Sequence, residues 1–399
     1  MMPGPPPRVA LFTDSYNEAN GVARLSRALT SHAVRTGLPF LCVHGASVDE
    51  WHRENSVQRL SLRRSQAAFR LEHDLRFDPL LWRHYGTTRD ALTRFRPDVV
   101  HITGPSDVGQ LGALLAHRMG IPIVGSWHTN IHQYAALRAS RWCRCLPPRL
   151  RARLLGSIER HSLSAALLFY RVPRVLMAPN QDLVSLLSRR TGKVTHLMKH
   201  GVDSSVFAPR SHRGGHTVRV GFVGRLSAEK QVRRLANLSS ALDAAGIDAE
   251  FVIVGDGSER KWLEMAMPRA HFSGILDGEQ LADAYASFDL FAFPSQTETF
   301  GLAVLEAMAS GVTVLAMAQG GPGFVIEHDR SGWLARTAQE FVDAGVMLAR
   351  EPRRRERLGR GARARAERWS WDIVADELYD VYREIFTSPS IEQCGFQTG

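Results

Sequence analysis

Cysteine is scarce in this sequence, with four residues among 399. Four cysteines in a chain of this length are too few for a disulfide framework. Two of them form a Cys-x-Cys pair, but no second cysteine or histidine pair stands at metal-binding spacing, so we expect no zinc site. The cysteines are Cys42, Cys143, Cys145 and Cys394.

Long hydrophobic runs are also missing. The nearest candidate, Leu163–Val172, is interrupted by Arg171. A membrane-spanning helix needs roughly 18 or more consecutive apolar residues, so none is expected. The first residues, MMPGPPPR, lack the apolar core of a secretory signal. We therefore expect a cytoplasmic protein.

Two cofactor motifs are absent. The first predicted strand is not followed by the Gly-x-Gly-x-x-Gly turn of a dinucleotide-binding fold. The nearest approach to an Asp-x-Asp metal motif is Glu72-His73-Asp74, within the basic stretch Arg63–Arg76, which we interpret as helical. We therefore expect neither a cofactor nor a required metal ion.

Positive charge is in excess, with a formal net charge of +10. This charge favours an anionic partner, such as a nucleic acid, a membrane surface or a phosphorylated substrate. Arginines alternate with leucines from Arg138 to Arg174, and such a basic amphipathic segment can lie on an anionic membrane. The alternative is a solvated helix that packs its leucines on its own domain. No recognised nucleic-acid motif accompanies the charge, so we do not expect nucleic-acid binding.

The most informative stretch runs from Phe291 to Gly311. Leu290–Pro294 is short and apolar, as expected for a buried parallel strand, and Leu302–Ser310 has helical spacing. The polar turn Ser295–Gly301 would then join the carboxyl end of a strand to the start of a helix. Ligands bind at this position in open parallel sheets, and the helix start favours an anion such as a diphosphate.

Two carboxylates frame this turn, Glu298 within it and Glu306 inside the apolar helix. A carboxylate repels a phosphate but can accept hydrogen bonds from hydroxyl groups. Backbone amides for a phosphate, flanked by carboxylates for hydroxyls, therefore indicate a site for a nucleotide sugar. Glu298 could instead be an ordinary acid at a helix start, and Glu306 a solvated residue. A lone carboxylate in an apolar helix is costly, however, so Glu306 is expected to have a partner.

The strand-loop-helix pattern occurs twice. Arg8–Thr13 is a predicted strand followed by a loop in which Gly21 would let the backbone approach a ligand, although an ordinary turn is an equal alternative. Val218–Gly224 restarts the pattern, and Arg225 and Lys230 follow it. Two cations at such a turn suit a diphosphate, although either alone could be a surface charge. The repeat predicts two doubly wound domains in tandem.

Further predicted strands separate these sites. Ile121–Trp127 delivers His128 to its carboxyl end, where an α/β domain places its chemistry, although a single histidine is more often structural. Gln319–Gly323 is interpreted as a flexible turn, and residues 340–386 as helical with a break at Trp369–Asp372. Val194–Asp203 closes the first half of the chain. The remaining predicted strands are Pro39–Gly45, Val57–Leu62, Asp98–Thr103, Val175–Pro179, Ala249–Gly257, Ala270–Leu276 and Val312–Ala318.

Taken together, these motifs resemble the GT-B glycosyltransferases of the large retaining family 4, also called group 1. The resemblance extends from Arg8 to about Phe386. Its motifs are NGV at Asn20–Val22, HT at His128–Thr129, HGVD at His200–Asp203, GRLSAEK at Gly224–Lys230, VGDG at Val254–Gly257, E-x7-E from Glu298 to Glu306, and SWD at Ser370–Asp372.

The resemblance implies a GT-B fold, in which two Rossmann-like, doubly wound parallel-sheet domains face each other across a cleft. It implies an acceptor-side domain at residues 1–203 and a donor domain at 204–371. A final helix at 372–388 would cross back to the first domain, and 389–399 would be a loose tail.

The resemblance also implies roles for individual residues. Arg225 and Lys230 would hold the diphosphate, Glu306 would accept the ribose hydroxyls, and Glu298 would position the sugar. The implied catalytic residues are Glu298, His128, Arg225 and Lys230. The implied donor-binding residues are Gly21, Gly224, Arg225, Lys230, Gly255, Ser273, Ile275, Glu298, Phe300, Gly301, Leu302 and Glu306.

The implied reaction transfers a sugar from a UDP- or GDP-sugar to an acceptor hydroxyl with retention of configuration and without a metal. The motifs look most like those of mannosyl- and glucosyltransferases acting on lipids or glycolipids, which would place the protein peripherally at the inner membrane face. The sequence departs from the usual family pattern at Gln231, at Asn180 and Gln181, and at Lys199 and His200. Two alternatives remain: a catalytically silent nucleotide-sugar or membrane-surface binding protein, and a nucleotide-sugar epimerase.

Overall fold

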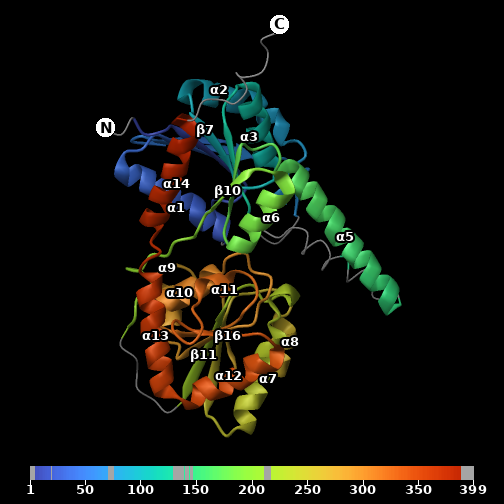
Figure 1. Ribbon diagram of the computed structural model, residues 1–399, viewed down its shortest axis with the longest axis vertical. Coiled ribbons are helices and arrows are strands. Elements are labelled where there is room, and N and C mark those ends of the chain that lie inside the picture. Colours follow the sequence, from blue (N-terminus) through green and yellow to red (C-terminus); the bar gives the residue numbers. More distant parts are fainter. Residues whose placement is uncertain are drawn as a thin grey trace. The chain divides into compact units, whose positions relative to one another are not determined.

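The computed structural model describes residues 5–18, 20–70, 76–128, 139, 143, 147–210 and 217–387. The chain divides into two compact units (Figure 1). The first unit combines Met1–His128, Leu163–Met198 and Trp371–Gly399, and the second combines Thr129–Ser162 and Lys199–Ser370. The last helix therefore belongs to the same unit as the first strand.

The first unit is built on an eight-stranded sheet in the order β10-β9-β8-β7-β1-β2-β4-β3. All neighbouring strands are parallel except β3 and β4, which form an antiparallel pair. The strands are β1 (Val9–Thr13), β2 (Phe40–Ala46), β3 (Glu50–Glu54), β4 (Val57–Arg63), β7 (Val99–Ile102), β8 (Ile123–Ser126), β9 (Val175–Ala178) and β10 (Val194–Leu197).

Helices cover both faces of this sheet. Alternate residues of β1 point to opposite faces, so Val9 and Leu11 pack with α1 and α14, whereas Ala10 and Phe12 pack with α2 and α3. The helices are α1 (Gly21–Thr36), α2 (Tyr85–Phe95), α3 (Asp107–Arg118), α6 (Gln181–Thr191) and α14 (Trp371–Thr387), with a 3-10 turn η1 (Leu81–His84). A longer helix, α5 (Pro148–Phe169), contributes residues to both units.

The second unit is built on a six-stranded parallel sheet in the order β13-β12-β11-β14-β15-β16. Its strands are β11 (Val218–Val223), β12 (Ala249–Val254), β13 (His271–Gly274), β14 (Leu290–Phe293), β15 (Thr313–Met317) and β16 (Trp333–Ala335). Its helices are α7 (Arg233–Ala244), α8 (Arg260–Ala266), α9 (Gly278–Ala286), α10 (Leu302–Ala309), α11 (Gly321–Val325), α12 (Ala338–Arg350) and α13 (Pro352–Ala366), with the 3-10 turn η2 (Ala228–Lys230).

Every strand that the sequence predicts is present within one to a few residues, but some strands were not predicted and two other predictions were wrong. Strand β3 was missed because all five of its residues are exposed, which removes the hydrophobic signal. The three-residue β16 was also missed. The predicted helix at Arg63–Arg76 is wrong where the chain is described, because β5 (Phe69–Arg70) and β6 (Arg76–Phe77) form a small antiparallel sheet.

The predicted flexible turn at Gln319–Gly323 is wrong as well. Helix α11 begins at Gly321, and the Gly321 amide donates to the Glu298 carbonyl at 2.8 Å. A Cβ added to Gly321 would lie 2.1 Å from the Phe300 carbonyl oxygen. The glycines here permit tight packing against the Ser295–Gly301 turn rather than flexibility.

Candidate active site

The strand order changes direction between β11 and β14 in the second unit. From β11 the sheet extends through β12 and β13 on one side, and through β14, β15 and β16 on the other. Such a switch point opens a crevice at the carboxyl ends of the strands, where open α/β sheets bind ligands. The two loops beside it are Gly224–Gln231 after β11 and Ser295–Gly301 after β14. They are the loops that carry most of the predicted site.

The structure brings these two loops into direct contact. The Lys230 ammonium pairs with Glu298 Oε1, although 68 residues separate them. Ser295 Oγ donates a hydrogen bond to the same Glu298 oxygen at 3.1 Å. Beside this pair, Gln231 Nε2 donates to Gln296 Oε1 at 2.8 Å. Lys230 and Glu298 therefore form one polar unit at the switch point.

Arg225 lies on the same loop as Lys230. Its side chain is 29% exposed, and its Nε is 3.9 Å from Glu229 Oε1, a loose ion pair. Gln231, which follows Lys230, has a left-handed backbone with φ of 52°. Glycine adopts this conformation without strain, which explains why a small residue is common here in the family that the sequence resembles.

Helix α10 begins at the far end of the Ser295–Gly301 turn. Gly301 has a left-handed backbone with φ of 94°, and the helix starts at Leu302. The first amides of a helix lack intrahelical acceptors, so this start can hold an anion. Phe300 anchors the Ser295–Gly301 turn in the core. Its buried ring stacks on His200 with a centroid distance of 4.7 Å. Burial lowers the pKa of His200 to about 4, so this ring is neutral at pH 7.

Glu306 is buried within α10, as the sequence predicted, and has the partner that burial demands. The Tyr285 hydroxyl donates a hydrogen bond to Glu306 Oε2 at 2.9 Å, and both residues are less than 5% exposed. Helix α9 thus supplies the group that holds the Glu306 carboxylate.

The remaining predicted residues of this unit follow along the same sheet edge. The amide of Gly255, after β12, donates to the Gly274 carbonyl at 2.6 Å, next to Ser273. Gly255 has φ of 129°, and an added Cβ would lie 2.0 Å from the Gly224 carbonyl oxygen, so only glycine allows this approach. Ile275 follows β13 and is 63% exposed. Gly224, Gly255, Ser273 and Ile275 therefore occupy neighbouring strand ends.

Gly21 and His128, the other predicted residues, lie in the first unit. Gly21 is the first residue of α1, and Asn20 caps that helix by accepting a hydrogen bond from the Ala23 amide at 2.9 Å. His128 follows β8 and is 8% exposed, and its Nε2 is 2.7 Å from Ser126 Oγ. Both residues stand at carboxyl ends of strands, on the loops after β1 and β8.

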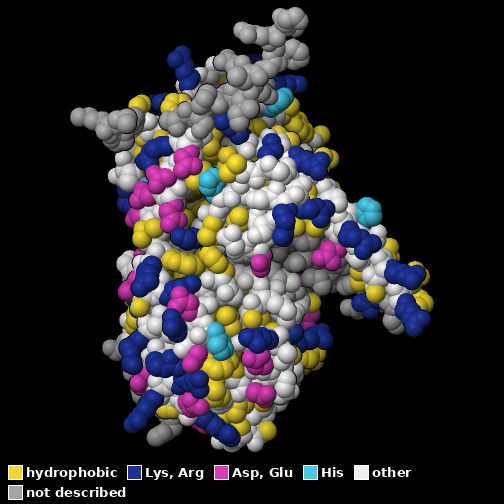
Figure 2. All heavy atoms as spheres, in the orientation of Figure 1, with side chains coloured by type: hydrophobic (Ala, Val, Ile, Leu, Met, Phe, Trp, Pro, Cys, Tyr) yellow, Lys and Arg dark blue, Asp and Glu magenta, His cyan; other side chains and the backbone are white. Residues whose placement is uncertain are grey.

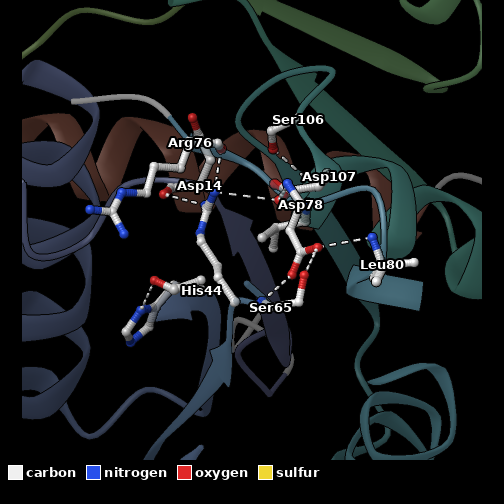
Figure 3. Close-up of polar contacts among 12 residues, drawn as sticks. Asp14, His44, Ser65, Arg76, Asp78, Leu80, Ser106 and Asp107 are labelled. Atoms are coloured by element: carbon white, nitrogen blue, oxygen red, sulfur yellow. Dashed lines mark hydrogen bonds and ion pairs between the residues drawn. The ribbon is translucent and has the colours of Figure 1, made fainter. Parts of the chain in front are cut away.

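A buried charge cluster at the same edge of the first sheet was missed by the sequence analysis. Arg64, which follows β4, places its Nη1 3.4 Å from Asp107 Oδ2 and donates from Nη2 to the Asp14 carbonyl at 3.3 Å. Figure 3 shows Asp14, Asp78 and Asp107 close to one another. The signal available was the position of Asp14, directly after the first strand.

The three carboxylates of this cluster have different surroundings. Burial raises the pKa of Asp14 to about 6, against the opposing effects of its backbone hydrogen bond and of Arg64. Burial also raises the pKa of Asp107, again against Arg64. Burial would raise the pKa of Asp78 too, but hydrogen bonds from the Ser65 hydroxyl and amide and from Arg83 outweigh it and hold that pKa far below its ordinary value. Burial therefore raises the pKa of both Asp14 and Asp107, whereas hydrogen bonds lower the pKa of Asp78.

The sequence matches two families of known proteins. "Glycosyl transferases group 1" matches residues 217–351, and "Glycosyltransferase Family 4" matches residues 19–206. A GDP-mannose-dependent alpha-mannosyltransferase of Mycobacterium tuberculosis (strain CDC 1551 / Oshkosh) is 33% identical over 95% of this chain and 97% of its own length. This chain is a family 4, group 1 glycosyltransferase.

Two further similarities agree with this family. A GDP-mannose-dependent alpha-mannosyltransferase of Mycolicibacterium smegmatis (strain ATCC 700084 / mc(2)155) is 34% identical over 75% of this chain and 77% of its own length. The solved structure of sucrose-phosphate synthase from Thermosynechococcus elongatus superposes with a TM-score of 0.72 and 17% identity, covering 96% of this chain and 99% of that one. The predicted GT-B fold and the predicted transfer from a nucleotide sugar to an acceptor are confirmed. Neither a silent binding protein nor an epimerase is favoured.

Some predicted features of this glycosyltransferase lie outside the described residues. These are Glu72-His73-Asp74, most of the segment between Thr129 and Leu146, and the tail from Ser388. Among the residues that the structure describes, no group of three His, Cys, Asp or Glu side chains could hold a metal ion. No helix in the described ranges is long and apolar enough to span a membrane.

Proposed function

We propose that this glycosyltransferase transfers mannose from GDP-mannose to an acceptor hydroxyl on a lipid or glycan, with retention of configuration and without a metal. The observation that carries the proposal is the Lys230–Glu298 pair, which joins the two loops at the switch point of the second sheet. The choice of GDP-mannose over a UDP-sugar follows the similarity to the two mycobacterial enzymes. In this proposal residues 204–371 form the donor domain, and residues 1–203 with the helix at 372–388 form the acceptor domain.

The donor diphosphate is held by cations and backbone amides. Arg225 supplies a planar guanidinium and Lys230 a point charge, while the amides at Phe300, Gly301 and Leu302 lie at the start of α10. These charges stabilise the diphosphate as it leaves, and fixed charges placed where charge develops usually contribute most to the rate of such a transfer.

The sugar, ribose and base occupy the positions around these phosphates. Glu298, fixed by Lys230 and Ser295, accepts hydrogen bonds from the sugar hydroxyls. Glu306, which Tyr285 holds in place, accepts hydrogen bonds from the ribose hydroxyls. The base lies along the strand ends at Gly224, Gly255, Ser273 and Ile275.

The first unit provides the acceptor side of the reaction. In this proposal Gly21, at the start of α1, serves the donor phosphates, and His128, after β8, serves the reacting sugar and the acceptor hydroxyl.

The proposed chemistry is a same-face displacement. Glu298 and Glu306 each have a fixed partner, which suits positioning rather than nucleophilic attack. The bond from the anomeric carbon to the phosphate oxygen breaks, the acceptor oxygen bonds to the same face, and the departing phosphate takes the acceptor proton. Arg225 and Lys230 supply the charge stabilisation that a metal would otherwise provide.

A membrane surface is the proposed location of the acceptor. Leu150 and Leu154 on α5 are 53% and 40% exposed, and Arg149 and Arg153 on the same helix are exposed beside them. Figure 2 shows the Lys and Arg side chains gathered along this helix. Exposed leucines with arginines match the requirements of an interfacial helix on anionic lipid.

The function is tested by GDP release from GDP-mannose, measured with and without EDTA, with UDP-glucose as the comparison donor. Transferases leak sugar to water, so wild-type protein should release GDP slowly without acceptor and faster with a suitable lipid or glycan. Glu298→Gln should lower the rate by about 100-fold, because it removes the charge that pairs with Lys230. Consumption of UDP-glucose with GDP-mannose left intact would overturn the donor assignment, and loss of activity in EDTA would overturn metal independence.

A further inference from the structure

A buried chain of hydrogen bonds connects the last helix to His128 within the first unit. The Tyr382 hydroxyl on α14 is 2.6 Å from His101 Nδ1 on β7. His101 Nε2 is 2.9 Å from Ser126 Oγ on β8, and Ser126 Oγ is 2.7 Å from His128 Nε2. Four side chains from three neighbouring elements and the turn after β8 thus form one continuous chain.

The inner members of this chain are fully enclosed. Tyr382, His101 and Ser126 are each 0% exposed. Burial lowers the pKa of His101 to about 3, so its imidazole is neutral at pH 7. Burial raises the pKa of the Tyr382 hydroxyl well above its ordinary value, so this hydroxyl keeps its proton. Neutral groups in a dry environment hold one arrangement of protons, because a misplaced donor has no water to satisfy it.

The direction of the hydrogen bonds follows from the Tyr382 end. Among the described residues, the Tyr382 hydroxyl has a single hydrogen-bond partner, His101 Nδ1. Its proton is satisfied only if Tyr382 donates to Nδ1, which leaves the His101 proton on Nε2. His101 then donates to Ser126 Oγ. The Ser126 hydroxyl has two acceptors within reach, His128 Nε2 at 2.7 Å and the Ile102 carbonyl at 3.4 Å, and the shorter contact assigns its proton to His128 Nε2. The reverse direction would bury the Tyr382 proton without an acceptor in the part of the chain that the structure describes.

We propose that Tyr382, His101 and Ser126 are positioning residues that hold the His128 ring in the tautomer with its proton on Nδ1. In this state Nε2 is the acceptor for Ser126, and Nδ1–H is a hydrogen-bond donor. The last helix therefore sets the chemistry of a side chain at the end of β8, although the two lie far apart in the sequence. The consequence for turnover rests on the proposed function, because it needs His128 to contact the transferred sugar or acceptor.

The structure offers a matched pair of substitutions on α14. Tyr382→Phe removes one hydroxyl from the hydrogen-bond chain and keeps the buried ring. Tyr379→Phe removes a hydroxyl one turn earlier that is equally buried but has no hydrogen-bond partner among the described residues. Both variants keep their packing, so both should fold with the circular dichroism spectrum of the wild type.

The first readout is the protonation of the His128 ring nitrogens, measured by NMR on protein labelled with nitrogen-15 in histidine. His128→Gln assigns the signals. We expect a protonated Nδ1 and an unprotonated Nε2 in the wild type and in Tyr379→Phe. Tyr382→Phe should produce a mixture of tautomers. A wild type with the proton on Nε2, or an unchanged spectrum in Tyr382→Phe, would overturn the proposal.

The second readout is turnover with GDP-mannose. Tyr382→Phe should lower kcat by about three- to tenfold with little change in donor KM, since one buried hydrogen bond is lost and donor contacts remain. Tyr379→Phe should leave kcat unchanged. If the tautomer shifts in Tyr382→Phe while kcat stays at the wild-type value, the positioning of His128 stands and its role in the proposed function fails. The two ideas can therefore fail separately.

Discussion

The Tyr285 hydroxyl donates a 2.9 Å hydrogen bond to Glu306 Oε2 inside the second unit. Both side chains are enclosed, with Glu306 4% exposed. A carboxyl group in an apolar helix is tolerated only with such a partner, so the bond satisfies and orients the Glu306 side chain. In the proposed site that orientation presents the carboxylate to the ribose hydroxyls.

Tyr285→Phe should therefore destabilise the protein and weaken donor binding. Loss of a hydrogen bond to a buried carboxylate costs about 1–3 kcal/mol in the free energy of unfolding, measured by urea denaturation. The donor KM should rise at the same time. Tyr379→Phe is the control, because that hydroxyl has no partner among the described residues. Equal stability in the two variants would contradict the importance of the Tyr285–Glu306 bond.

Lys230→Met and Glu298→Gln should each lower kcat/KM for GDP-mannose by about 100-fold. The double variant should lose much less than the product of the single losses, because both side chains belong to one polar unit. A coupling energy of about 1–3 kcal/mol from the four measured rates is expected. Gln231→Ala, which alters only the neighbouring Gln231–Gln296 hydrogen bond, serves as the comparison. Additive losses in the double variant would show that the two residues act independently.

The pKa of Asp14 predicts a pH-dependent stability difference. Because burial raises this pKa from 3.8 to about 6, the folded protein binds the proton more tightly than the unfolded chain. The contribution of Asp14 to wild-type stability therefore falls as the pH rises from about 4 to about 6. The asparagine of Asp14→Asn does not ionise. The free energy of unfolding of this variant, minus that of the wild type, should therefore increase by about 1–3 kcal/mol between pH 4 and pH 6.

Denaturation of both proteins at pH 4 and pH 7 measures this difference. Asp98→Asn is a suitable control, because Asp98 caps the backbone at Arg8 away from the cluster. A difference between Asp14→Asn and the wild type that is the same at both pH values would contradict the raised pKa of Asp14.

Membrane contact through α5 should depend on charge. Wild-type protein should float with liposomes that contain anionic lipid and remain unbound to neutral liposomes. Arg149→Gln with Arg153→Gln should reduce binding by about 30-fold, since each cation near an anionic surface contributes about 1 kcal/mol. Arg269→Gln with Arg350→Gln, on exposed positions of the second unit, is the charge-matched control. Equal flotation of the two double variants would argue against α5 as the contact.

Much of the fold could be predicted because buried parallel strands have apolar sequences with polar residues at their ends. Lys230 and Glu298 could be assigned to two different strand ends in this way. Their pairing could not, because only the adjacency of β11 and β14 in the sheet brings the two loops together. The Tyr382–His101–Ser126 chain was hidden for the same reason, since α14 packs on the first sheet from the other end of the sequence.

The cluster around Arg64 shows what sequence patterns leave out. A Cβ added to Gly45 would lie 2.5 Å from Arg64 Nε, so the guanidinium occupies space that a glycine on the neighbouring strand leaves open. The hydrophobic periodicity of the sequence does not reveal this packing of Arg64 against Gly45. The Gln319–Gly323 segment misled for a related reason, because its glycines serve close packing on the Ser295–Gly301 turn.

Nucleotide binding by the second unit is the central claim, and thermal unfolding of the wild type and Arg225→Ala with GDP, UDP and ADP tests it most directly. A ligand that binds only the folded state raises the melting temperature by mass action. We predict that GDP gives the largest increase in the wild type and that Arg225→Ala loses most of it, with both proteins melting at the same temperature without nucleotide. Equal shifts in the two proteins, or no shift with any nucleotide, would contradict the proposed diphosphate site.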